Sequence, residues 1–269
     1  MYGTVISASA FMMRGSEVCD EILHGMSFRV LGHGRGRMTY HIETDYGYRG
    51  DISGKDVMLS EKLTDANGAN ANFYRPDCMV SGMFADVLTA PSVRSAILKT
   101  LLRGCMVRVM GDVVNEFMLI ELADGIRGYI RAAFVQEAGR QVKSGRRWKQ
   151  GDEQTLRKSL LDSAMCYIGT QYRWGGKSPL GIDCSGLCFM AYRENGITIY
   201  RDATIKPGYA IHEISREKMK PADLAFLPGH VAMYAGGGLF VHSSVRNNGV
   251  AVDRLEGYPL EEMVVGSVF

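Results

Sequence analysis

One cysteine and two histidines in the last third of the chain have the side chains that thiol hydrolysis requires. Cys184 stands in the segment GIDCSG at 181–186, and His230 and His242 follow it. In such chemistry a thiol attacks, one imidazole exchanges the proton, and a second polar group orients that imidazole. These three residues are therefore the predicted catalytic group of a cysteine hydrolase.

The two histidines are predicted to face each other in one β-hairpin. Two short apolar runs, 229–234 and 239–242, flank a glycine-rich segment that is typical of a turn. A turn centred on Gly236 places His230 directly opposite His242, with both rings on the same sheet face. A register shifted by one residue would separate them onto opposite faces.

Cys184 is predicted to lie in the first turn of a buried helix. The run from Ser185 to Tyr192 is apolar enough at helical spacing to be buried, and Asn195-Gly196 is a typical helix end. The N-terminus of a helix favours an anion, and a nearby imidazolium adds to this, so such a thiol can have a pKa of about 3.5 to 7.5. We therefore expect a thiolate at neutral pH.

Four blocks of the sequence, in order, resemble the NlpC/P60 cysteine peptidases. The blocks are GTQYRWGGKSPLGIDCSGL at 169–187, KPADL at 220–224, GHVAMY at 229–234 and FVH at 240–242. The resemblance runs through 153–269 and implies a papain-like α/β core that hydrolyses bacterial cell-wall peptides. It implies that Cys184 is the nucleophile, that His230 is the general base and then acid, and that His242 orients His230.

Further residues resemble one subgroup of that family, the γ-D-glutamyl-L-diamino acid endopeptidases. The resemblance implies cleavage of the γ-D-Glu–diamino acid bond in murein peptides with a free N-terminal L-Ala. It places Tyr172 beside the nucleophile and assigns the free amino terminus to Asp183 and Ser185, and a carboxylate is a suitable partner for an ammonium group. The other predicted substrate-binding residues are Trp174, Arg201 and Asp202. The alternative is a broader endopeptidase or amidase that acts on intact cell wall.

The first half of the chain contains an internal repeat. Segment 22–32 aligns with 101–111, and segment 47–52 aligns with 125–130. Alternating apolar runs broken by glycine predict small antiparallel barrels, which resemble bacterial SH3-like domains. The subgroup resemblance implies that the first barrel caps the active site.

The predicted fold class is α+β, with a papain-like NlpC/P60 catalytic domain after two small all-β SH3-like barrels. The predicted parts are barrel 1 at 1–64, barrel 2 at 73–138, a basic linker at 139–152 and the peptidase domain at 153–269. An amphipathic helix with apolar residues between Leu156 and Ile168 should open the peptidase domain.

Composition limits the other functional classes. The chain has 269 residues and a net charge of +2, so the basic run is interpreted as a solvated linker and no nucleic-acid partner is expected. Its six cysteines form no C-x-x-C pair, and no segment approaches 18 uninterrupted apolar residues. We expect a monomer without metal, cofactor or membrane contact that acts on a murein peptide. The absence of an export signal favours a cytoplasmic protein, whereas a secreted or wall-associated one is the alternative if the sequence is part of a longer chain.

The sequence allows three other interpretations of the cysteine. Cys184 could be buried and inert, or it could bind zinc together with Cys188, His230 and His242. The zinc set is disfavoured because two cysteines on successive helical turns make a poor tetrahedral pair with a cross-strand histidine couple. The chain could also be a wall-binding module with a degenerate enzyme domain, but all three catalytic positions are intact.

Overall fold

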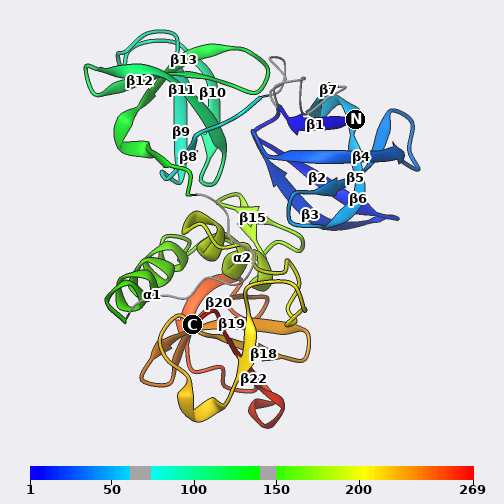
Figure 1. Cartoon of the computed structure of the whole chain (residues 1–269), viewed down its shortest axis with the longest axis vertical. Coiled ribbons are helices and arrows are strands. Elements are labelled where there is room, and N and C mark those ends of the chain that lie inside the picture. The colour runs from blue at the N-terminus through cyan, green and yellow to red at the C-terminus, as the bar shows by residue number, and fades with distance from the viewer. Residues whose placement is uncertain (61–73, 140–149) are drawn as a thin grey trace. The chain divides into compact units, whose positions relative to one another are not determined.

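A computed structural model describes residues 1–60, 74–139 and 150–269 of the chain. These residues divide into two units, Met1–Ala138 and Gly139–Phe269 (Figure 1). Residues 61–73 and most of the predicted basic linker lie outside the described residues. No helix in the described part of the chain is long and apolar enough to cross a membrane.

The first unit contains two sheets of seven strands each. The strands of the first sheet are β1 (Tyr2–Val5), β2 (Ser9–Arg14), β3 (Glu17–Leu23), β4 (Ser27–His33), β5 (Thr39–Thr44), β6 (Arg49–Ser53) and β7 (Val57–Ser60). Those of the second are β8 (Cys78–Val80), β9 (Phe84–Leu88), β10 (Ile97–Leu102), β11 (Met106–Val114), β12 (Phe117–Glu121), β13 (Arg127–Arg131) and β14 (Val135–Glu137). The short 3-10 helices η1 (Gly54–Asp56) and η2 (Ala132–Phe134) precede the last strand of each sheet.

The two sheets have the same topology. The first has the order β3-β2-β6-β5-β4-β1-β7, and the second has the order β10-β9-β13-β12-β11-β8-β14. The repeat extends to a turn, because Gly25 and Gly104 both have positive φ angles, of 76° and 89°. Each donates its N–H at 2.9 Å to a strand carbonyl, that of Val5 or that of Val80. The internal repeat seen in the sequence is therefore a repeat of structure.

The second unit has two helices and a six-stranded antiparallel sheet. The helices are α1 (Gln150–Met165) and α2 (Cys184–Glu194), with the 3-10 helices η3 (Arg216–Lys218) and η4 (Leu260–Glu262). The sheet has the order β17-β22-β18-β19-β20-β21. Its strands are β17 (His212–Ile214), β18 (Leu224–Leu227), β19 (His230–Gly236), β20 (Leu239–Ser244), β21 (Gly249–Asp253) and β22 (Val264–Ser267), and a separate hairpin is formed by β15 (Lys177–Ser178) and β16 (Gly181–Ile182).

Helix α2 packs against β19 and β20 and is buried along its whole length. Asp183 caps its N-terminus by accepting a hydrogen bond from the Gly186 N–H at 2.6 Å, and Asn195 is the C-cap. The predicted helix and its end are confirmed. Helix α1 is shorter than predicted, because it ends at Met165 and leaves Ile168 beyond it and 53% exposed.

The register of the β19–β20 hairpin differs from the predicted one. The turn lies at Gly237 and Gly238, whose φ angles of 62° and 78° suit a two-residue turn, and is not centred on Gly236. His230 is therefore not directly opposite His242, and the predicted pairing is wrong.

A β-bulge nevertheless keeps both histidines on one face of the sheet. The register shifts between Tyr234 and Gly236, so Ala235 has no partner on β20. Because side chains alternate between faces, continuous pairing from this turn would have put His230 and His242 on opposite faces. The extra residue restores the shared face, and the two rings meet diagonally.

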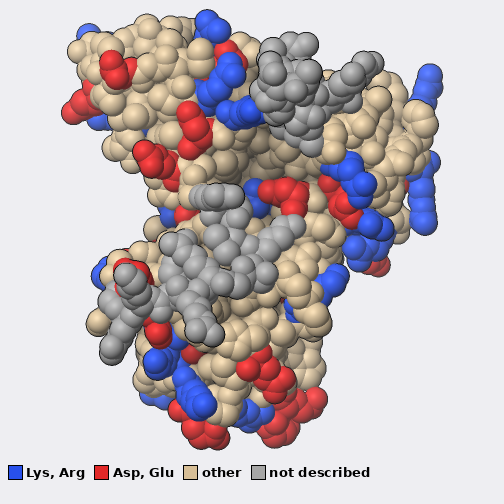
Figure 2. Space-filling view, in the orientation of Figure 1, with Lys and Arg blue, Asp and Glu red and all other residues tan. Residues whose placement is uncertain are grey.

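Both signs of charge are present on each unit. On the face in Figure 2, acidic and basic side chains occur over the described parts of both units. This distribution agrees with a net charge of only +2 for the whole chain.

Candidate active site

Helix α2 begins close to the start of strand β19, which brings Cys184 to the strand that carries His230. Cys184 is the first residue of α2, and its side chain is buried. Its sulfur interacts with the backbone groups of Ser185, in the same helical turn, and of Val231, which directly follows His230 on β19. The predicted nucleophile therefore lies where the helix N-terminus meets the start of the strand that carries the predicted base.

The two imidazoles form a buried hydrogen-bonded couple. Nε2 of His230 lies 2.8 Å from Nδ1 of His242, and the ring planes meet at 81°. Since Nε2 of His230 is used in this bond, Nδ1 is the ring nitrogen left to serve Cys184. The predicted proximity of His230 and His242 is thus confirmed, although by a different register.

Burial favours the neutral forms of both Cys184 and His230. It raises the pKa of the Cys184 thiol to about 11, with a further contribution from the negative charge of Asp183. It lowers the pKa of His230 to about 4, and the neighbouring His242 adds to this effect. The expectation of a thiolate at neutral pH is therefore wrong for the free protein. That expectation included the effects of the helix N-terminus and of an imidazolium on the pKa of the thiol. It did not include the effects of burial and of the adjacent carboxylate.

The pH dependence of thiol alkylation tests this neutral pair. Only the thiolate reacts with iodoacetamide, so the alkylation rate of Cys184 should rise about tenfold per pH unit from pH 7 to 10. Peptide mass spectrometry would follow Cys184, with the exposed Cys166 as the reference thiol in the same sample. A rate that is constant from pH 5 to 9 would instead indicate a preformed thiolate–imidazolium pair. Because His230 must be neutral to act as a base, kcat/KM should fall only as the pH approaches about 4.

Tyr172 borders the sulfur, as the sequence predicted. The residue is half-buried. A β-bridge holds its backbone beside that of Ile182, which is two residues before Cys184 in the sequence. Burial, followed by the charges of Cys184 and Asp183, raises the pKa of Tyr172 to about 12. Its hydroxyl therefore stays protonated at neutral pH and can donate a hydrogen bond.

Asp183 and Arg201 form a buried cluster behind the nucleophile. Oδ1 of Asp183 accepts hydrogen bonds from the N–H of Gly186, the hydroxyl of Ser185 and Nη1 of Arg201. Oδ2 accepts from the N–H of Gly175 and from Nη2 of Arg201. These five donors fill the lone pairs of the carboxylate.

The predicted substrate contacts of this cluster are therefore corrected. Asp183 has no acceptor capacity left for an ammonium group, and Arg201 is only 2% exposed and is bonded to Asp183, Ser185 and the Gly176 carbonyl. Both side chains hold the start of α2 in place. Trp174 is 65% exposed, and its role in substrate binding stays a prediction.

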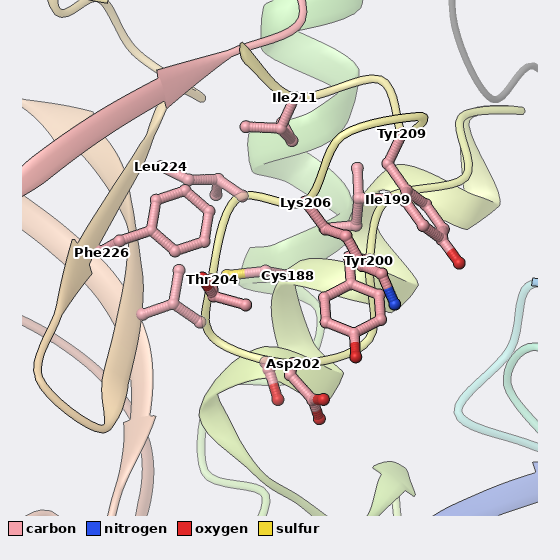
Figure 3. A pocket seen from close by; sticks show the side chains of 12 residues that line it. Cys188, Ile199, Tyr200, Asp202, Thr204, Lys206, Tyr209, Ile211, Leu224 and Phe226 are labelled. Carbon is pink, nitrogen blue, oxygen red and sulfur yellow. The ribbon is translucent and has the colours of Figure 1, made fainter. Parts of the chain in front are cut away.

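A hollow beside the nucleophile contains the remaining predicted residues (Figure 3). It shares Ser185 and Val231 with the surroundings of the Cys184 sulfur. Asp202 contributes a carboxylate to its wall. The other lining residues are Cys188, Ile199, Tyr200, Thr204, Lys206, Tyr209, Ile211, Leu224 and Phe226.

Two residues of the site were missed by sequence reasoning. Tyr258 stacks on His230 with ring centroids 4.6 Å apart, and Oδ1 of Asp253 lies 3.0 Å from Nε2 of His242. Asp253 ends β21, so a predicted register for β20 and β21 would have placed it beside His242. Tyr258 lies in a segment without regular structure, where no sequence pattern points to it.

The four residues considered as zinc ligands do not converge. His230 and His242 are bonded to each other, and Cys188 is fully buried one helical turn after Cys184. No group of three or more His, Cys, Asp or Glu side chains within the described ranges is arranged to hold a metal ion.

Comparison with known proteins agrees with this geometry. Residues 169–268 match the NlpC/P60 family. A dipeptidyl-peptidase 6 from Lysinibacillus sphaericus is 37% identical over 249 residues, which are 91% of this chain and 87% of that protein. A gamma-D-glutamyl-L-lysine dipeptidyl-peptidase from Bacillus cereus is 32% identical over 238 residues, which are 85% of this chain and 65% of that protein.

A solved structure supports the fold. An NlpC/P60 family protein from Bacillus cereus superposes with a TM-score of 0.77 and covers 99% of this chain and 98% of that one, at 18% identity. Together with the match at 169–268, it confirms the expected fold class, an α+β peptidase domain after all-β SH3-like barrels.

Proposed function

Because this chain belongs to the NlpC/P60 family and is a cysteine peptidase, we propose that it hydrolyses the γ-D-Glu–diamino acid bond of cell-wall peptides with a free N-terminal L-Ala. The names of its relatives, dipeptidyl-peptidase 6 and gamma-D-glutamyl-L-lysine dipeptidyl-peptidase, support a peptidase acting on peptidoglycan peptides. The observation that carries the proposal is the position of Cys184 at the start of β19, which carries His230 of the hydrogen-bonded couple, and next to Ser185, which lines a hollow that contains a carboxylate.

The reaction proceeds from the neutral pair. As the Cys184 sulfur attacks the γ-carbonyl carbon of D-Glu, Nδ1 of His230 takes the thiol proton. The backbone N–H of Cys184, in the first turn of α2, and the hydroxyl of Tyr172 donate to the developing oxyanion. His230 then gives the proton to the leaving amine of the diamino acid. Water activated by His230 hydrolyses the thioester and restores the thiol.

Asp202 is the residue proposed to meet the free amino terminus. It is proposed in this role in place of Asp183 because its carboxylate lines the hollow that Ser185 also lines. An ammonium group paired with a carboxylate forms a strong charged hydrogen bond, and a blocked amine cannot form it.

Paired substrates test this specificity. L-Ala-γ-D-Glu-diamino acid and its N-acetylated form would be compared in the native protein and in Asp202→Asn. We expect the native protein to favour the free amine by at least about tenfold in kcat/KM, and Asp202→Asn to lose that preference through a higher KM. Glu217→Gln, an exposed carboxylate on η3, is the control and should retain it.

One relative supports the alternative of a broader endopeptidase that acts on intact cell wall. A probable endopeptidase p60 from Listeria innocua is 32% identical over 114 residues, which are 40% of this chain and 24% of that protein. Digestion of purified sacculi, followed by mass spectrometry of the products, distinguishes the two. Efficient release of fragments from sacculi, with equal turnover of free and acetylated tripeptide, would support the endopeptidase and refute the preference for a free amine.

A further inference from the structure

The hydrogen-bonded chain of the active site continues beyond His242 to Asp253. Asp253 is the last residue of β21 and pairs with Phe240 on β20, which places its carboxylate beside the ring of His242. Oδ1 lies 3.0 Å from Nε2 of His242 and also accepts the Leu255 N–H at 3.0 Å. Oδ2 accepts Nδ2 of Asn247 at 2.6 Å. The carboxylate is thus held from three sides.

These contacts keep Asp253 ionised. Burial alone would raise its pKa, but the hydrogen bonds from Leu255, Asn247 and His242 outweigh it and lower the pKa below the ordinary value. An ionised carboxylate can only accept hydrogen bonds, so Nε2 of His242 must be the donor.

When both imidazoles are neutral, that single constraint fixes the protons along the whole chain. A neutral imidazole carries one N–H, so His242 protonated on Nε2 accepts at Nδ1. The 2.8 Å bond between the rings then requires His230 to donate from Nε2. Nδ1 of His230 is left with a lone pair, which is the form that a base for Cys184 needs.

We propose that Asp253 is a positioning residue that sets the tautomers of both imidazoles, so that His230 presents an unprotonated Nδ1 to Cys184. The inference deepens the proposed function and rests on it for its kinetic consequence. Asp253 does not touch the reacting atoms, and it acts through His242.

The structure also contains a group that would favour the opposite tautomer of both imidazoles. Nδ2 of Asn247 lies 3.4 Å from Nε2 of His242 and can only donate. Without the carboxylate, an amide donor at this position favours His242 with its proton on Nδ1. His230 would then accept at Nε2 and carry its own proton on Nδ1, where it cannot take one from the thiol.

Other charges surround Asp253 and supply a matched control. A second hollow behind the imidazole couple is lined by Arg246, Arg254, Glu256 and Asp253, together with His242, Ser244, Asn247 and Tyr258. Glu256 is exposed, and its backbone carbonyl accepts a hydrogen bond from Nη1 of Arg246. Glu256→Gln therefore removes a negative charge from the same hollow without removing the acceptor for His242.

The experiment compares Asp253→Ala, Asp253→Asn and Glu256→Gln in the full chain. Nitrogen NMR of the histidine rings distinguishes a protonated ring nitrogen from one with a lone pair. Turnover would be measured on L-Ala-γ-D-Glu-diamino acid. In the native protein we expect both His230 and His242 to be protonated on Nε2.

Asp253→Ala should lose this single tautomer and lower kcat about 100-fold, with KM within about twofold. Asp253→Asn should be affected less, because the Leu255 N–H selects the amide oxygen for the Oδ1 position, where it still accepts from His242. Glu256→Gln should match the native protein in both measurements.

Unchanged tautomers in Asp253→Ala would overturn the inference, and so would an equal loss of kcat in Glu256→Gln. Failure of the native protein to cleave the tripeptide would reject the proposed substrate instead. In that case the NMR comparison, which needs no substrate, still decides the role of Asp253.

Discussion

Replacing Cys184 with alanine should abolish peptide hydrolysis, with a loss of at least about 10⁴-fold in kcat. The sulfur is the attacking atom, and no other described side chain beside the His230–His242 couple is a thiol. The residue begins a helix that is buried throughout and is capped by Asp183, so losing one sulfur atom should leave the fold intact. The loss of kcat is measured as turnover of L-Ala-γ-D-Glu-diamino acid. Circular dichroism checks that the variant is folded.

Two other cysteines provide controls for that variant. Cys166 is exposed, and Cys166→Ser should keep full activity. Cys188 is buried one helical turn after Cys184, so Cys188→Ala should cost some stability but leave the same reaction. Native activity should be lost on alkylation at high pH and should survive a chelator. Hydrolysis that persists in Cys184→Ala, or that a chelator removes, would contradict a thiol mechanism.

The catalytic residues could be predicted from the sequence because their signals are local. Cys184 lies in a short motif at the start of an apolar helix, and His230 and His242 flank a glycine-rich turn. The register could not be predicted, since it depends on one β-bulge. Asp253 was missed because no register was predicted for β20 and β21, although Asn248-Gly249 at the start of β21 is a turn signal, and it reaches His242 diagonally across that strand pair.

The electrostatics of the site could not be predicted from residue types. The sequence shows a carboxylate next to a thiol, but it does not show that Asp183 is filled by Arg201 and backbone donors. Nor does it show that burial, more than the helix N-terminus, determines the pKa of Cys184. Both effects depend on which distant segments cover the start of α2. The segment that carries Arg201 is therefore as important for the site as the motif around the nucleophile.

Replacing Arg201 with methionine should destabilise the second unit by about 3–5 kcal/mol, because it leaves the buried carboxylate of Asp183 without its countercharge. Arg201 is 2% exposed and bonds to both oxygens of that carboxylate. Since Asp183 caps the helix that begins with Cys184, kcat should fall as well. The two tryptophans, Trp148 and Trp174, both follow residue 139 in the sequence, so urea unfolding followed by their fluorescence reports on this unit.

Two further variants test whether the stability is lost because a buried countercharge is removed or because an ion pair of any kind is removed. Lys158 and Asp162 pair on the surface of α1 with side chains 76% and 61% exposed, so Lys158→Met should cost less than about 1 kcal/mol. Adding Asp183→Asn to Arg201→Met should recover much of the lost stability, because the neutral amide can still cap α2 and no unpaired charge remains. If the double variant is as unstable as the sum of the single changes, the two side chains are not coupled. The buried pair would then not be what holds the nucleophile in place.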